Sequence, residues 1–97
     1  MNQTICDAIA GRNLLQISYN GGMRTIEPHC HGISTAGNES LRAFQTGGHS
    51  NSGKPVDWKM ITVAKILSIN IMQERFVANR PGYNPNDKGM SSVHCHV

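Results

Sequence analysis

Acidic side chains are scarce in this chain of 97 residues, which has six aspartate and glutamate residues in all. So few carboxylates argue against an acid–base enzyme of the two-carboxylate kind. The glycine-rich Walker loop and the Gly-x-Ser-x-Gly nucleophile elbow are both missing. A cysteine–histidine nucleophile would need a third, orienting residue, and none stands out. The sequence therefore predicts a protein that is not an enzyme.

Long apolar runs and a secretory leader are lacking as well. No stretch is apolar over the length that a membrane-spanning helix needs. The first thirteen residues, MNQTICDAIAGRN, have neither the basic n-region nor the apolar h-region of a signal peptide. We therefore expect a cytoplasmic protein with no membrane partner.

Cysteine occurs three times, as Cys6, Cys30 and Cys95. An odd count without an export signal favours reduced thiols, although a single disulfide is compatible with it. The net charge is +3 and the sequence pI is about 9.0, with only 15% charged residues. This mildly basic balance tolerates a phosphate-bearing ligand without requiring one.

The length predicts one domain over residues 1–97, of the α+β class and mostly β. A helix is expected at 2–11, where Ile5, Ala8 and Ile9 fall at positions i, i+3 and i+4 of one face. The strands are expected to follow over 14–76 as a small β-barrel. Residues 77–97 are rich in turn formers and are read as an extension that ends in a further short strand.

Five or six short antiparallel strands are predicted within this barrel region. Alternating apolar residues place them at 14–19, 23–27, 29–35, 40–46, 58–63 and 66–72. The strongest turn signal is Asn20-Gly21-Gly22, because these residues tolerate the positive φ of a hairpin turn. Pro28 is expected to end or kink its strand, and Gly32 to mark a bulge.

An ordered series of residues within this pattern resembles a known family. It comprises an Ala-Ile helix, Ile17-Ser18-Tyr19, Arg24, Glu27-Pro28, Gly32, Gly37, Leu41-Arg42-Ala43 and an apolar strand from Trp58 to Ile66. Over residues 5–76 the chain resembles a WYL domain, the ligand-sensing module common in bacterial transcription regulators and phage-defence controllers. The resemblance implies an Sm-like small β-barrel that binds nucleic acid or nucleotide-type ligands.

The chain departs from the family pattern in three ways. Of the Trp-Tyr-Leu tripeptide only Leu41 remains, within NESLRA at 38–43. The segment SGKPVDWK stands where the family has an arginine-rich stretch, and too few residues come first for a helix-turn-helix. The expectation is a stand-alone WYL-like module that is not an enzyme. It would bind a nucleotide, a cyclic oligonucleotide or a short nucleic acid, as a sensor or a sequestering protein, in a context such as phage-defence signalling.

Basic and aromatic residues supply the candidate ligand-binding set. The set is Tyr19, Arg24, Arg42, His49, Ser50, Lys54, Trp58 and Lys59. Arginine forks suit phosphates, glycine-rich backbone can add N–H donors, and aromatic rings can stack on a base. The alternative interpretation places Tyr19 and Trp58 in the core and the arginines at solvated sheet edges.

A doubled His-Cys-His triplet supplies a second hypothesis, a metal site. Its ligands would be His29, His31, His94 and His96. Alternation along a strand puts both histidines of a triplet on one face, so two adjacent strands could offer four imidazoles to zinc. The alternative is two polar-faced strands with both cysteines inward, and no other cofactor is expected.

A third hypothesis needs no small ligand at all. An exposed sheet edge could recruit a protein partner or a second copy of the chain, through strand addition.

Overall fold

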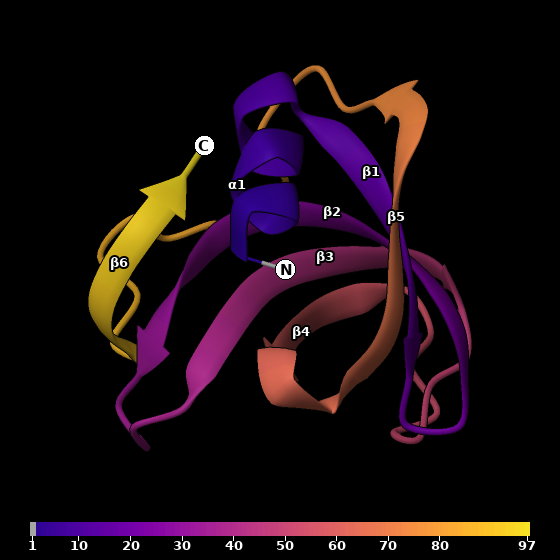
Figure 1. Ribbon diagram of the computed structural model, residues 1–97, viewed down its shortest axis with the longest axis horizontal. Coiled ribbons are helices and arrows are strands. Elements are labelled where there is room, and N and C mark those ends of the chain that lie inside the picture. The colour runs from indigo at the N-terminus through magenta and orange to yellow at the C-terminus, as the bar shows by residue number, and fades with distance from the viewer. Residues whose placement is uncertain (1) are drawn as a thin grey trace.

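The computed structural model describes residues 2–97, which form one helix and six β-strands (Figure 1). The helix α1 spans Asn2–Gly11, the residues at which the sequence places it. The strands are β1 (Asn13–Tyr19), β2 (Gly22–Ser34), β3 (Glu39–Gly48), β4 (Asp57–Thr62), β5 (Ile66–Arg75) and β6 (Met90–His96). The predicted domain range also includes Met1, which lies outside the described residues.

All six strands belong to one antiparallel sheet. Five of them follow the order β4-β3-β2-β1-β5, and β6 pairs with β2. The long strand β2 organises this sheet, because β3 pairs along one of its sides and two strands share the other. The first half of β2 pairs with β1 through the predicted turn, where Asn20 and Gly21 both have positive φ. The second half pairs with β6, so the first and last strands lie on the same side of β2.

The predicted Sm-like β-barrel is wrong, because the sheet does not close. Strands β4 and β5 are the two ends of the strand order, and they pair with β3 and β1 but not with each other. A three-residue 3-10 turn, Val63–Lys65, separates them in sequence. Strand alternation and tight turns determine neighbours along the chain, whereas barrel closure depends on whether two edge strands meet in space. The fold is therefore an open, strongly curved sheet with one helix.

The hydrophobic core lies between α1 and the face of the sheet that we call the inner face. Helix α1 buries Ile5, Ala8 and Ile9, the three positions that the helical spacing predicts. The inner face contributes Leu15, Ile17, Tyr19, Ile26, Leu41, Ala43, Ile61, Val63 and Ile66. Figure 1 shows the helix lying across the hollow of the curved sheet. Within residues 2–97, no helix has the length and apolar character that crossing a membrane requires.

A bulge in β2 changes which way its side chains point. Pairing with β3 is in register from Ile26 opposite Gln45 to Pro28 opposite Ala43, then resumes at Cys30 opposite Arg42, which leaves His29 as the extra residue. Because the two-residue alternation is interrupted there, His29 and His31 lie on opposite faces of the sheet. The kink expected at Pro28 thus takes the form of a bulge beside it.

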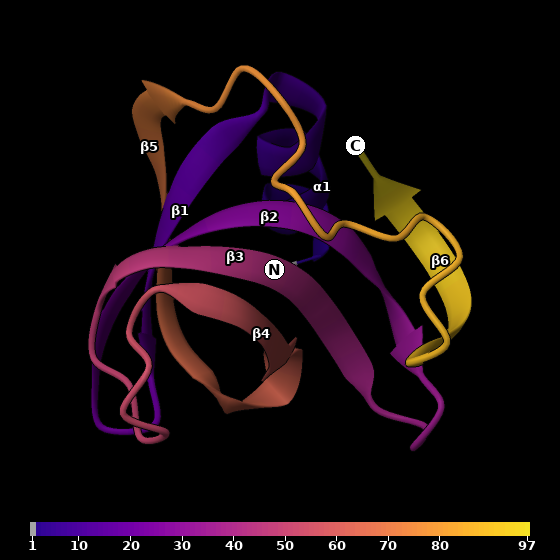
Figure 2. The ribbon, with the colours of Figure 1, turned by 180° about the vertical axis from the view of Figure 1, so that it is seen from behind.

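The segment 77–89 covers the opposite face of the sheet, which we call the outer face. It leaves β5, crosses in front of β2 in Figure 2 and returns to the sheet as β6. Two ion pairs hold it: Arg80 Nε donates to Glu27 over 2.6 Å, and Asp87 accepts from Arg42 Nε over 2.6 Å. The proline- and glycine-rich extension is thus packed against the sheet and anchored to β2 and β3.

Candidate functional site

The eight predicted ligand-binding residues divide between the two faces of the sheet. In the pairing of β3 with β4, Phe44 lies opposite Trp58 and Ala43 lies opposite Lys59. Paired residues share a face, so Trp58 lies on the outer face and Lys59 on the inner one. The register of β1 and β2 likewise places Arg24 opposite Ile17 on the inner face. Arg42 and Trp58 are therefore separated from the other six residues by the thickness of the sheet.

The outer face contains a cavity of about 280 Å³. It is lined by Arg42, Trp58, Gly82, Tyr83, Asn84 and Asp87. The rings of Trp58 and Tyr83 lie 6.2 Å apart and close to parallel, at 27°. The indole N–H of Trp58 donates to the carbonyl of Pro81 over 3.0 Å, which fixes the ring toward the segment 77–89. The lining of the cavity thus includes a stacked pair of aromatic rings and a polar rim.

The polar side of this cavity is an ion pair held in a fixed geometry. Arg42 donates two hydrogen bonds to Asp87, over 2.6 and 3.2 Å, and the backbone N–H of Gly89 donates a third over 2.8 Å. The hydrogen bond from Arg42 holds the pKa of Asp87 below its ordinary value. A carboxylate has about four lone-pair sites, so Asp87 keeps acceptor capacity toward a ligand.

Beside the cavity, His29 is completely buried and both of its ring nitrogens are engaged. Nδ1 lies 2.8 Å from the carbonyl of Glu27, and Nε2 lies 3.1 Å from the backbone N–H of Arg80. Only the neutral ring with its proton on Nδ1 satisfies both bonds. Burial lowers the pKa of His29, which favours the same neutral form. Its ring packs against Trp58, Phe76 and Tyr83, so His29 supports the stacked pair of aromatic rings.

Arg80 closes the same region from the side of the extension. Its guanidinium donates to both carboxylate oxygens of Glu27, over 2.6 and 3.1 Å, and lies 4.6 Å from the centre of the Phe44 ring. The hydrogen bond to Glu27 raises the pKa of Arg80. Burial raises the pKa of the Tyr83 hydroxyl, so this ring is neutral at physiological pH. In the outer-face site, each arginine is thus paired with a carboxylate, so the site is nearly neutral in charge.

The inner face carries a different, cationic group of residues. Arg24 is 5% exposed, and its guanidinium lies 5.1 Å from the centre of the Tyr19 ring. Its hydrogen-bond partner is the neutral amide of Gln45, over 3.3 Å, and Nε has no partner within the described residues 2–97. A buried guanidinium without a carboxylate is costly, and an anionic ligand would relieve that cost.

The loop after β3 lies next to Arg24. Gln45 accepts from Arg24 and donates to the carbonyl of His49 over 2.8 Å. Lys59 reaches into the loop and donates to Ser50, Ser52 and the carbonyl of Lys54, over 3.1, 3.1 and 2.8 Å. The six remaining predicted residues therefore gather at one end of the inner face. They are Tyr19, Arg24, His49, Ser50, Lys54 and Lys59.

The four imidazoles of the predicted metal site do not come together. The bulge in β2 places His29 in the outer-face cluster and His31 inside, while His96 is exposed and bonds its neighbour Val97. The pairing of β6 with β2 also shifts at His94, whose ring lies 5.3 Å from that of His31. Of the predicted set, only His31 and His94 are adjacent.

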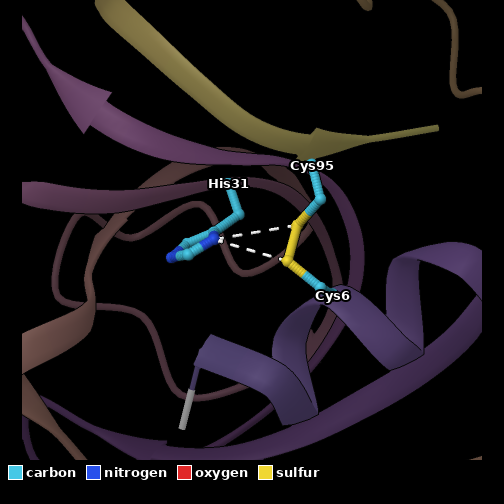
Figure 3. A group of neighbouring side chains, drawn as sticks. All are labelled: Cys6, His31 and Cys95. Atoms are coloured by element: carbon cyan, nitrogen blue, oxygen red, sulfur yellow. Dashed lines mark hydrogen bonds between the residues drawn. A yellow bond between two sulfur atoms is a disulfide. The ribbon is translucent and has the colours of Figure 1, made fainter.

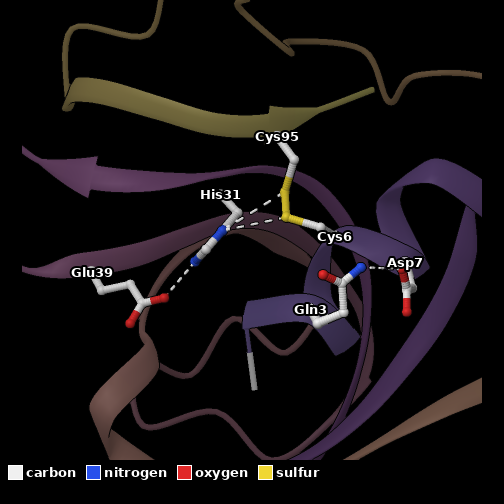
Figure 4. Close-up of a disulfide and its surroundings, with 6 residues drawn as sticks. All are labelled: Gln3, Cys6, Asp7, His31, Glu39 and Cys95. Carbon is white, nitrogen blue, oxygen red and sulfur yellow. Dashed lines mark hydrogen bonds and ion pairs between the residues drawn. A yellow bond between two sulfur atoms is a disulfide. The ribbon is translucent and has the colours of Figure 1, made fainter.

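His31 instead faces two sulfur atoms. Cys6 of α1 and Cys95 of β6 form a disulfide, and each Sγ lies 3.7 Å from His31 Nδ1 (Figure 3). The other nitrogen of the ring, Nε2, bonds Glu39 over 2.7 Å (Figure 4). The expectation that all three thiols are reduced is therefore corrected. Only Cys30 is a free cysteine among the described residues, and burial raises the pKa of its thiol.

Sequence reasoning missed several residues of the outer-face cavity and of the cluster of Cys6, His31 and Cys95. Tyr83, Asn84 and Asp87 lie in a stretch that reads as turns, RPGYNPNDKG, where the signals of packing were Tyr83 and Met90, which directly follows the stretch. Cys6 and Cys95 are 89 residues apart, so no local spacing could pair them. A comparison of the chain with family models, curated proteins and solved structures found no match in any of the three. The resemblance to a WYL domain stays a prediction.

Proposed function

We propose that this protein binds a nucleotide or a short single-stranded nucleic acid and is not an enzyme. The observation that supports this best is the outer-face cavity, whose lining includes the rings of Trp58 and Tyr83. Its volume of about 280 Å³ lies just below the range of drug-sized ligand sites, which suits a single nucleobase. The resemblance to WYL domains supports the same class of ligand.

The side chains around the cavity fit the two surfaces of a base. The aromatic rings offer π-faces, and stacking of one base is worth about 1–3 kcal/mol in single-strand binders. Asn84 supplies a donor and an acceptor, and Asp87 keeps acceptor capacity for an amino or imino group at the base edge. Shape and hydrogen bonding together favour a base over an aliphatic ligand.

The phosphates would lie at the basic end of the inner face. Trp58 and Lys59 are consecutive residues of the edge strand β4, so a ligand passing over this edge can reach both groups. Arg24 and Lys59 have no carboxylate partner within residues 2–97, whereas Arg42 and Arg80 are each paired with one. We therefore place a backbone phosphate by Arg24 and the 49–56 loop, with its base in the outer-face cavity.

Calorimetry with mono-, cyclic and oligonucleotides at two salt concentrations tests this function. Tyr83→Leu keeps apolar bulk but removes the π-face, and Arg24→Met removes the unpaired charge. Each variant is expected to weaken binding at least about tenfold, equal to 1.4 kcal/mol. Added salt should weaken oligonucleotide binding more steeply than mononucleotide binding, because more phosphates are contacted.

The matched control for Arg24→Met is Lys65→Met, which removes an exposed charge at the turn between β4 and β5. It should bind like the parent. If the parent protein binds no nucleotide, or if Tyr83→Leu and Arg24→Met bind as tightly as the parent and the control, the nucleotide proposal fails. The free edges of β4 and β5, with Leu67 81% exposed, would then favour a protein partner.

A further inference from the structure

We propose that Cys6, His31 and Cys95 bind a zinc ion when their disulfide is reduced. The three donor atoms, Sγ, Nδ1 and Sγ, all lie within 4.8 Å of one another (Figure 3). They come from α1, β2 and β6, so the ion would join β2 to the two elements that the disulfide joins, α1 and β6. Thiolate and imidazole are the donors that zinc prefers.

The distances suit a tetrahedral ion with little rearrangement. Zinc–ligand bonds of about 2.0–2.3 Å put neighbouring donor atoms roughly 3.4–3.8 Å apart. Both sulfur atoms already lie 3.7 Å from His31 Nδ1. Only the two sulfur atoms must move apart, from a covalent bond to neighbouring corners of the tetrahedron. Two separate thiols can make that change by side-chain rotation.

Glu39 prepares His31 for this role. Its carboxylate lies 2.7 Å from Nε2, so that nitrogen carries the proton and Nδ1 presents a lone pair to the sulfur atoms (Figure 4). A carboxylate behind a metal-bound histidine is the usual outer-shell arrangement, because it fixes the tautomer and the ring orientation. His31 is 1% exposed, so its ring has little freedom to turn away.

The two states of the site exclude each other. Reduction adds two electrons and two protons to the S–S bond, supplied by a dithiol that itself becomes a disulfide. Zinc then displaces both thiol protons and binds the two thiolates together with His31. With three protein ligands, the fourth position is left for water. The cluster would thus hold α1 to β6 through a covalent bond under oxidising conditions and through zinc under reducing ones.

Titration of the reduced protein with cobalt(II), a spectroscopic substitute for zinc, tests this inference. The protein is reduced with a phosphine, which is oxidised to its oxide and leaves no competing thiol. We expect one equivalent of cobalt, with the sulfur-to-cobalt charge-transfer absorption of a thiolate complex, and its displacement by zinc. His31→Asn should weaken cobalt binding by at least about tenfold, and Glu39→Ala should weaken it less.

His31→Asn keeps both cysteines, so its fold can be verified by circular dichroism in the oxidised state before reduction. Cys30→Ala is the matched control, because it removes the one cysteine outside the cluster, and it should bind cobalt like the parent. The inference is overturned if the reduced parent protein takes up no cobalt, whether folded or unfolded. It is overturned equally if His31→Asn binds like the parent or if Cys30→Ala loses the absorption.

Discussion

At the scale of single residues, the arginines of this protein serve two different purposes. Arg42 and Arg80 each form a two-point hydrogen bond with a carboxylate and hold the segment 77–89 on the sheet. Arg24 is more deeply buried but has only the neutral amide of Gln45. A charge that is desolvated without a counterion lowers stability, so the burial of Arg24 fits the proposed phosphate binding better than a role in folding.

The protonation of His29 should make the fold sensitive to mild acid. Burial lowers its folded-state pKa below the ordinary 6.5, so the unfolded chain takes up the proton first as the pH falls. The stability that depends on neutral His29 is therefore present above about pH 6.5 and is lost as the pH falls through the folded-state pKa. The loss is about 1.4 kcal/mol for each unit by which the two pKa values differ.

Urea unfolding at a series of pH values measures this loss. The charged groups facing His29 are Glu27, Arg12 and Arg80, and the variant His29→Phe leaves them in place. We expect His29→Phe to be less stable than the parent at neutral pH and to lose less stability in acid. The exposed residue His96 provides the control His96→Ala, which should keep the pH dependence of the parent. Equal pH dependence in the parent and His29→Phe would contradict the prediction.

At the scale of elements, the contact between β2 and β6 depends on a glycine. A Cβ atom at Gly32 would lie 2.0 Å from the carbonyl oxygen of Ser92, which is backbone and cannot rotate away. Gly32→Ala should therefore push β6 from β2 and lower the free energy of unfolding by about 1–3 kcal/mol, the usual range for overpacking. Hydrogen exchange of the β6 amides should quicken.

Gly47 in β3 provides the comparison for this change. Nothing lies within 4 Å of a Cβ atom at Gly47, so Gly47→Ala should leave the stability nearly unchanged. The role assigned to Gly32 would be refuted by two variants of equal stability.

Sequence reasoning succeeded for elements that are determined locally. The spacing of Ile5, Ala8 and Ile9 determines the buried face of α1, and Asn20-Gly21 accounts for the first hairpin. It failed where a single residue or a distant contact decides. The bulge at His29 places His29 and His31 on opposite faces, whereas strand alternation predicts one face. The barrel stays open because the edge strands β4 and β5 do not pair with each other.

In the candidate site, likewise, the residues on neighbouring strands were predictable and those in the irregular segment were not. Arg24, Lys59 and the loop between them gather because β2, β3 and β4 are neighbours in sequence and in the sheet. Tyr83 and Asp87 reach the sheet only through a segment without regular structure, so no periodicity could place them.

At the scale of the whole molecule, the disulfide connects residues near the two ends of the chain. Cys6 and Cys95 are 89 residues apart, and a loop of this length predicts about 4–5 kcal/mol of stabilisation from the restricted unfolded chain. We expect the double variant Cys6→Ser/Cys95→Ser to lose about 2–5 kcal/mol in metal-free urea unfolding. Cys30→Ala should lose less, about 1 kcal/mol. A double variant as stable as the parent would show that this crosslink does not hold the fold.

The same crosslink closes the oxidised chain into a covalent ring. Residues 6–95 lie inside the ring, including the exposed loop segment 51–56. A protease that cuts this loop once opens the ring but separates nothing, so the product gains the mass of one water and keeps both pieces. Reduction then divides it into an N-terminal piece that carries α1 and a C-terminal piece that carries β6, which no longer share a bond.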